Sequence, residues 1–357
     1  MENILEHLRS NLAARATAYD LAGAWPEESL AALTAASAWA WIVPRQYGGV
    51  QLDAIVHLHA YEAIAAGCMS SLLILTNRDS ACELIAANEN EALKSDLLPR
   101  LAANEIMTTV GIAQLTTSHQ TGPPAMTATA DGDSFRLNGF MPWVTSAIKC
   151  QYIVTGAVLP DRRQILAAVP TDLPGLVIAE PFKLMAMEGT LTSEVRCKDA
   201  VVERRYLLRG PAEKVLATRS GLKPALVAAS GVGLAQSMLE EIRQHAGPAG
   251  GMLAGMADEL GRRHQQTRKR VFDFAASADA LTAETKKSEI RIEVNDLLMR
   301  LSVALLSFTK GLGLLRQRDG QRLVREALFF LVWAAPEDVR VGTLARFVQP
   351  GQTTVTG

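Results

Sequence analysis

Two short segments hold side chains whose types and spacing could serve a bound cofactor. The first reads Gln114-Leu115-Thr116-Thr117-Ser118-His119, and the second reads Trp143-Val144-Thr145. Loop hydroxyls and backbone N–H groups can bind phosphate oxygens. An aromatic wall excludes water, and a neighbouring hydroxyl can tune the electronics of a cofactor that performs the difficult chemical step. The alternatives are an ordinary strand-to-loop junction for the first segment and a tryptophan packed in a β-sheet core for the second.

Histidine and cysteine do not occur in a pattern that would bind a metal ion. The six histidines lack metal-ligand spacing, and the four cysteines lie far apart in the sequence. These cysteines are Cys68, Cys82, Cys150 and Cys197. Reduced thiols in a cytoplasmic protein are the simplest interpretation, and no metal site is predicted.

Composition and charge indicate a globular protein without a nucleic-acid partner. Hydrophobic residues make up 48% of the chain and charged residues 20%, and 36 Lys+Arg against 37 Asp+Glu give a formal charge of −1. The first 14 residues mix charged with apolar side chains, unlike a signal peptide. The apolar stretch 297–315 is interrupted by Arg300 and Lys310, so no membrane-spanning segment is expected. We predict a soluble, cytoplasmic protein.

Three regions that differ in composition and periodicity follow one another and predict an α+β fold that is mostly α. Residues 1–108 have helical periodicity and predict an N-terminal helical domain. Residues 109–210 are richer in Thr and Val, with turn signals such as Asn138-Gly139, and predict a middle antiparallel β-domain. Residues 211–347 predict a C-terminal four-helix bundle, and 348–357 a polar tail.

Within these regions, individual elements can be placed. The expected strands include 135–137, 152–155, 165–169 and 194–197. The expected bundle helices are 224–246, 252–281, 288–308 and 321–335, each with an apolar stripe between charged flanks.

This order of domains resembles the acyl-CoA dehydrogenase family, and four motifs in the same order support the resemblance. Val43-Pro-Arg-Gln-Tyr-Gly-Gly49 looks like the family's V-P-x-x-Y-G-G turn, and Leu97-Leu-Pro-Arg-Leu101 like its Y-L-P-x-L element. Asn138-Gly-Phe-Met-Pro-Trp-Val-Thr-Ser146 is similar to N-G-x-K-x-W-I-T-N. The stretch 185–202 follows the run M-G-x-R-G-S-x-T-x-E-L-x-F-x-D-V-x-V. The likeness covers about residues 25–335.

The resemblance implies FAD as cofactor and assigns residues to its site. In the family, the tryptophan of W-I-T packs along the flavin and the threonine hydroxyl hydrogen-bonds the ring. Residues 114–119 match the loop L-T-E-P-x-x-G-S-D that holds the flavin and its pyrophosphate, with Thr117 in place of the acid and Ser118 in place of the proline. The implied FAD-binding residues are Leu115, Thr116, Thr117, Ser118, Trp143, Val144, Thr145, Gly311 and Gly313.

Two motifs that reach the flavin of a neighbouring subunit in the family are altered. The stretch 244–251 lacks the arginine and phenylalanine of R-x-x-F-G. In the stretch 307–313, Gly311 and Gly313 survive from Q-x-x-G-G-x-G. The resemblance implies a homodimer or homotetramer whose flavin sites are completed across the interface.

The family's catalytic base has no equivalent near the end of the chain. The family runs R-D-A-x-x-x-x-I-x-E-G-T, and its glutamate removes the proton α to the thioester carbonyl. Here Ala334 occupies the position of that glutamate. Some family members carry the glutamate on the first bundle helix, where Glu240 and Glu241 are the candidates. Carboxylates on a solvated helix surface are the alternative interpretation of both.

Three hypotheses follow for function. The first is an acyl-CoA dehydrogenase-like oxidoreductase that takes an acyl thioester or related small molecule, with FAD as hydride acceptor. The second is a flavin-dependent monooxygenase on the same scaffold, since such relatives also lack the glutamate. The third is a non-catalytic homologue, with or without flavin, that serves as a binding or structural subunit.

Overall fold

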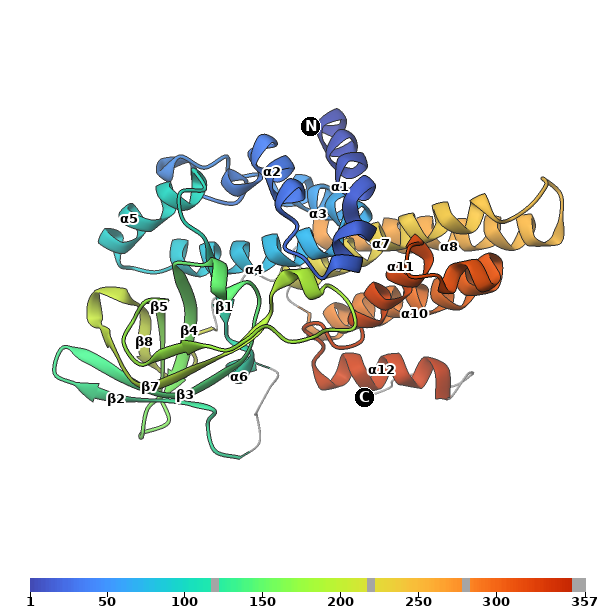
Figure 1. Cartoon of the computed structure of the whole chain (residues 1–357). Coiled ribbons are helices and arrows are strands. Elements are labelled where there is room, and N and C mark those ends of the chain that lie inside the picture. Colours follow the sequence, from blue (N-terminus) through green and yellow to red (C-terminus); the bar gives the residue numbers. More distant parts are fainter. Residues whose placement is uncertain (117–121, 217–221, 278–282, 349–357) are drawn as a thin grey trace.

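The computed structural model describes residues 1–116, 122–216, 222–277 and 283–348. The N-terminal helices lie above the sheet and the C-terminal helices lie to its right in Figure 1. The predicted order of helices, β-domain and helical bundle is confirmed. The N-terminal helices are α1 (Glu2–Ala22), α2 (Glu27–Ala35), α3 (Ala54–Gly67), α4 (Met69–Ala86) and α5 (Glu91–Ala102), with 3-10 turns η1 (Ala38–Ala40) and η2 (Arg45–Tyr47).

The sheet has eight strands in the order β6-β7-β3-β2-β4-β5-β8, with β1 paired to β4. Its strands are β1 (Thr108–Gly111), β2 (Met126–Asp131), β3 (Ser134–Val144), β4 (Tyr152–Val158), β5 (Gln164–Pro170), β6 (Leu176–Ile178), β7 (Ser193–Glu203) and β8 (Leu207–Ala212). The short helix α6 (Ala113–Thr116) follows β1. The sheet is antiparallel except where β4 pairs in parallel with β1 and β2. The four expected strands all lie within observed ones.

The C-terminal helices are α7 (Lys223–Gln244), α8 (Met252–Ala276), α10 (Glu284–Thr309), α11 (Asp319–Phe329) and α12 (Glu337–Val348), with the 3-10 segment η6 (Lys310–Leu314) after α10. Three of the predicted bundle helices match closely, although residues 278–281 of the second lie outside the described residues. The fourth was predicted to run to 335, yet it ends at Phe329 and is followed by turns. Apolar residues continue at helical spacing through Trp333, so the sequence pattern does not reveal this end. Helix α12 was not predicted as a separate element.

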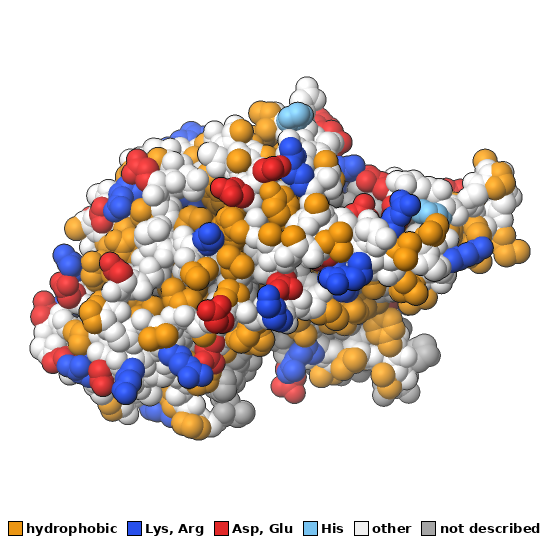
Figure 2. Space-filling view, in the orientation of Figure 1, with side chains coloured by type: hydrophobic (Ala, Val, Ile, Leu, Met, Phe, Trp, Pro, Cys, Tyr) orange, Lys and Arg blue, Asp and Glu red, His pale blue; other side chains and the backbone are white. Residues whose placement is uncertain are grey.

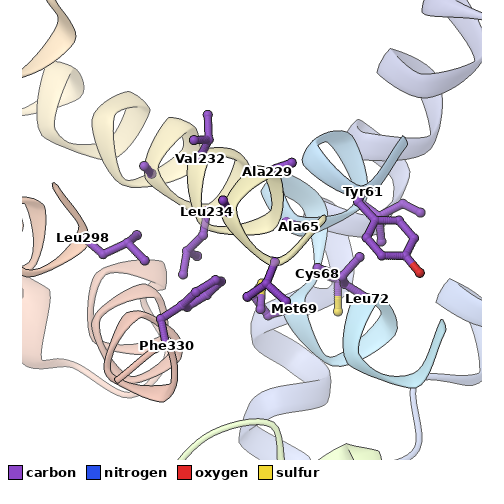
Figure 3. Close-up of a cluster of buried hydrophobic side chains, with 14 of the residues drawn as sticks. Tyr61, Ala65, Cys68, Met69, Leu72, Ala229, Val232, Leu234, Leu298 and Phe330 are labelled. Carbon is purple, nitrogen blue, oxygen red and sulfur yellow. The ribbon is translucent and has the colours of Figure 1, made fainter. Parts of the chain in front are cut away.

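One continuous core joins the N-terminal helices to the bundle. In Figure 3, side chains of α3 and α4 face those of α7, with Leu298 of α10 and Phe330 beside them. Helix α4 lies between the sheet and the other N-terminal helices (Figure 1). Its first half, with Leu72 and Leu75, belongs to this core, and its second half, with Cys82 and Ile85, packs with α5 and the sheet. Helix α4 therefore couples all three parts of the fold.

Helix α10 belongs to this core as well. By length and composition, the stretch Glu284–Leu314 is apolar enough to cross a membrane. However, Leu297, Leu298, Leu301 and Leu305 are 0–1% exposed within the bundle. We therefore interpret α10 as a core helix of the bundle.

The crossing of α3 and α7 depends on a glycine. A Cβ atom at Gly233 would lie 2.0 Å from the carbonyl oxygen of Glu62. Because that oxygen belongs to a helix backbone, the two helices would have to separate. We expect Gly233→Ala to lower the free energy of unfolding by about 1–3 kcal/mol, as overpacking does, and to lower the midpoint of thermal unfolding. Gly255→Ala on α8, where a Cβ meets open space, should instead stabilise by about 0.5–1 kcal/mol. Equal midpoints for the two variants would contradict this close packing.

Candidate functional site

A cavity of about 1060 Å³ lies where the sheet, α4 and the C-terminal helices meet. Its walls come from α4, the segment around α6, the end of β3, residues 184–192, the first turns of α7, α10 and α12, and α11 with the turns that follow it. In the space-filling view the outline is notched between the sheet and α12 (Figure 2). Its lining is mainly apolar, and the cavity is large enough for a cofactor ring together with a second small molecule.

The end of β3 places Trp143 and Thr145 on the cavity wall. Successive side chains of a strand alternate between faces, so Val144, between them, points the other way and is fully buried in the core of the sheet. The Trp143 ring is 53% exposed and packs against Phe182 at a centroid distance of 4.9 Å. Trp143 is therefore not a β-core residue, and it offers an aromatic surface to the cavity.

Three threonine hydroxyls form a hydrogen-bonded chain, of which Thr145 and Thr192 line the cavity and Thr190 does not. The Thr190 hydroxyl donates to the carbonyl oxygen of Met187 (2.8 Å), Thr190 and Thr192 are 2.9 Å apart, and Thr192 and Thr145 are 3.3 Å apart. Because Thr190 uses its hydrogen on Met187, Thr192 donates to Thr190 and Thr145 to Thr192. The Thr145 oxygen then keeps its lone pairs for a donor in the cavity.

Thr190 and Thr192 were not predicted as site residues. They belong to the segment 185–202, whose resemblance was noticed without a role for any residue. A turn with left-handed backbone at Met187 and Leu191 (φ 56° and 50°) brings their hydroxyls into the hydrogen-bonded chain with Thr145. Only the resemblance in this segment could have drawn attention to them.

The predicted loop residues divide into three groups. Thr116, at the end of α6, lines the cavity, and its hydroxyl donates to the carbonyl oxygen of Ile112 (3.3 Å). Leu115 packs with the hydrophobic cluster of α4, α5 and the sheet, and it closely approaches Gly156. Thr117 and Ser118 lie outside the described residues. The phosphate-binding role of this loop stays a prediction.

Ala334 lies on the cavity wall, in the turns after α11. It is exposed and has a left-handed backbone, with φ 44°. The guanidinium of Arg291 on α10 donates to the carbonyl oxygens of Trp333 (2.9 Å) and Ala334 (3.3 Å). A methyl group and a neighbouring buried cation therefore occupy this part of the wall.

Residues 2–105 match the family described as acyl-CoA dehydrogenase, N-terminal domain. The probable acyl-CoA dehydrogenase YngJ of Bacillus subtilis (strain 168) is 24% identical over 97% of this chain and 96% of its own length. The chain thus resembles acyl-CoA dehydrogenases over almost its whole length. The probable acyl-CoA dehydrogenase fadE25 of Mycobacterium leprae (strain TN) is 30% identical over 64% of this chain and 60% of its own length. The solved complex of glutaryl-coenzyme A dehydrogenase with glutaryl-CoA superposes with a TM-score of 0.85 at 17% identity, covering 97% of this chain and 94% of that one.

The two surviving glycines of the altered family motif do not line this cavity. Gly311 and Gly313 are in η6, beyond the end of α10, whereas only the first turns of α10, from Glu284 to Arg291, line the cavity. Neither glycine lines the cavity, although Gly313 packs against Gly320 at the start of α11, whose later turns do line it. Their predicted contact with a flavin stays a prediction.

The two candidate bases on α7 also lie away from the cavity. Glu240 forms an ion pair with Arg9 (3.0 Å), and Glu241 lies 3.9 Å from His245. The cavity-lining part of α7 ends at Val227, about 20 Å along the helix from Glu240. The geometry therefore favours the interpretation that both are carboxylates outside the site.

The carboxylates that do line the cavity belong to Glu284 and Asp338, at the first turns of α10 and α12. Glu284 is exposed and forms an ion pair with Lys287 (2.6 Å), and Asp338 is exposed and accepts a hydrogen bond from Ser288. Among the described residues, no buried carboxylate lines this cavity. The cavity wall at Ala334 therefore lacks the carboxylate that removes a proton in the family.

Proposed function

We propose that the chain is a flavin-dependent oxidoreductase that acts on an acyl thioester or a related small molecule, with FAD as hydride acceptor. One observation supports this most directly: Trp143, Thr145 and Ala334 line one cavity of about 1060 Å³. Residues separated by almost 200 positions thus meet in the arrangement that the family resemblance implies for a flavin and its substrate.

The described residues fit the ring of a flavin. Trp143 offers an exposed aromatic face, and most of the remaining lining is apolar. Thr145 offers a hydroxyl oxygen that accepts an N–H donor, held in place by Thr192 and Thr190. When bound, FAD would supply the hydride acceptor. The protein would bind and orient the ring, exclude water from it and hold the acyl group beside it.

Proton removal is the step of this reaction for which the chain lacks the family's base. Dehydrogenation would need FAD to take up a hydride from the β-carbon and a protein base to take up a proton from the α-carbon. With Ala334 at the base position, the proton has to leave to water or to a weaker acceptor. We therefore expect slow reduction by a simple acyl thioester, since general-base catalysis is typically worth about 10²–10⁴-fold.

Purification and anaerobic titration test the proposal. The purified protein should show the visible absorbance of oxidised flavin, or take it up from added FAD, and an acyl thioester should bleach that absorbance. Oxygen uptake with a flavin reductase, without bleaching by thioesters, would indicate the monooxygenase instead. A colourless protein that does not bind FAD would leave only the non-catalytic homologue.

Trp143→Ala should weaken FAD binding at least about tenfold, because the lost aromatic contact and its buried area exceed about 1.4 kcal/mol. The midpoint of thermal unfolding without flavin should hardly change, because the side chain is already 53% exposed. Fluorescence titration with FAD measures the affinity. Val177→Ala, which removes another exposed apolar side chain outside the cavity, is the control. A large loss of stability with unchanged affinity would instead indicate a structural tryptophan.

We also propose a cytoplasmic homodimer or homotetramer. The support is that the predicted flavin contacts Gly311 and Gly313 do not line the cavity, as the family resemblance implies for residues that reach the flavin of another subunit. Analytical ultracentrifugation of the FAD-loaded protein tests this, and a monomer at micromolar concentration would contradict it.

A further inference from the structure

Arg291 is a buried cation without an acidic partner. Three arginines are buried in the part of the chain that the structure describes, namely Arg78, Arg291 and Arg322. Arg78 pairs with Asp79 (2.9 Å), and Arg322 pairs with Glu326 (3.0 Å). Arg291 is 4% exposed and has only the carbonyl oxygens of Trp333 and Ala334 as acceptors, while its Nε has no partner.

The charge of Arg291 is retained in this environment. Burial lowers the pKa of the guanidinium to about 10, which is still far above neutral pH. A buried charge without a counter-charge is costly, and two neutral carbonyl groups offset only part of that cost. Of the five N–H groups of a guanidinium, two are used here, so three remain for an acceptor. The cavity wall thus carries an uncompensated positive charge.

Three other basic residues in the described part of the chain line the cavity: Lys223 donates to the hydroxyl of Ser80 (3.4 Å), and the other two have acidic partners. Lys287 pairs with Glu284 (2.6 Å), and Arg325 pairs with Asp20 (2.5 Å). Arg291 therefore differs from Lys287 and Arg325 in offering its charge to a ligand. It also differs in position, because it lies beside Ala334, on the part of the wall that the family resemblance assigns to the reacting end of the acyl group.

We propose that Arg291 recognises an anionic group on the substrate, so that the preferred acyl thioester carries a carboxylate on its acyl chain. This inference rests on the proposed function for the thioester part. A guanidinium suits a carboxylate because its planar fork donates two parallel, charge-assisted hydrogen bonds. A carboxylate at this point would neutralise the buried cation, whereas a chain that ends in a methyl group would leave it unpaired.

Matched pairs of CoA thioesters test the proposal. Succinyl-, glutaryl- and adipoyl-CoA are compared with butyryl-, valeryl- and hexanoyl-CoA, which have the same chain lengths but end in a methyl group. Isothermal titration calorimetry on the FAD-loaded protein gives each affinity without requiring turnover. At one chain length at least, we expect the carboxylate to bind about ten- to a hundredfold more tightly, as hydrogen bonds to charged groups allow. Equal affinities in all three pairs would overturn the proposal.

Variants separate recognition from a merely structural role. Arg291→Gln should lose the preference for the carboxylate and keep its affinity for the methyl-ended partner, whereas Arg291→Lys should retain part of the preference. Arg300→Gln removes an arginine of α10 that is paired with Asp296 outside the cavity, and it should keep the full preference. If Arg291 only holds the turn at Trp333, Arg291→Gln will lower the unfolding temperature and leave the ratio of affinities unchanged.

A failure of the proposed function can be told apart from a failure of this inference. If no thioester binds, the thioester assignment is wrong, and free glutarate and valerate then become the probes. Stabilisation of the wild type by glutarate but not by valerate, absent in Arg291→Gln, would still support an anion site. No difference between the two acids would overturn it. If Arg291→Gln does not fold, the wild-type pairs and Arg291→Lys still decide the question.

Discussion

Replacing Ala334 by glutamate should accelerate the reduction of bound FAD by an acyl thioester by about 10²–10⁴-fold, the usual contribution of a general base. Ala334 is exposed on the cavity wall, so a longer side chain has room to enter. Its left-handed backbone, φ 44°, adds no new penalty for glutamate, because alanine already carries the Cβ atom that makes this conformation unfavourable. Stopped-flow measurement of flavin bleaching without oxygen gives the rate.

Ala334→Gln is the matched control, since it has nearly the same shape as glutamate but cannot accept the proton. A rate for Ala334→Glu no higher than that for Ala334→Gln would show that the acyl group does not lie against this turn. Arg291 would attract the new carboxylate and weaken it as a base. Combining Ala334→Glu with Arg291→Gln should therefore increase the rate further.

Glu326→Leu should destabilise the protein by about 3–5 kcal/mol, because it leaves the buried guanidinium of Arg322 without its main counter-charge. The side chains of Arg322 and Glu326 are only 6% and 3% exposed, with 3.0 Å between Nη1 and Oε2. Burial raises the pKa of the Glu326 carboxyl, and the charge of Arg322 opposes that rise. The midpoints of thermal and denaturant unfolding measure the effect.

Replacing both partners distinguishes the ion pair from simple loss of packing. The double variant Arg322→Met/Glu326→Leu should recover much of the lost stability, because apolar side chains of similar volume often replace a buried ion pair without loss. Glu259→Ala breaks an exposed ion pair with Arg262, in which both side chains are 62% exposed, and should cost less than about 1 kcal/mol. A Glu326→Leu variant as stable as Glu259→Ala would contradict this interpretation.

Much of the architecture could be predicted from local patterns. The apolar stripes of 224–246 and 288–308 predict α7 and α10 within a few residues, and alternation with turn signals predicts the main strands of the sheet. The end of α11 could not be predicted in this way. Apolar spacing continues through Trp333, while the chain itself turns at Phe330.

For the candidate site, the order of the motifs indicated Thr116, Trp143, Thr145 and the altered position of Ala334, and the structure brings all four to one cavity. The structure alone shows that Gly311 and Gly313 do not line that cavity, buries Val144, and adds Thr192 on the cavity wall with Thr190 hydrogen-bonded to it.

The sequence by itself determined the kind and order of the elements and the missing glutamate, because these depend on local periodicity and on motifs read in order along the chain. Only the tertiary structure decided which side chains, distant in the sequence, line the same cavity. Arg291 shows the reason: in the sequence it is one arginine among many on an amphipathic helix. Packing of α10 against the turn after α11 excludes water from its guanidinium and gives it two carbonyl oxygens, not a carboxylate, as partners. The buried charge therefore faces the cavity.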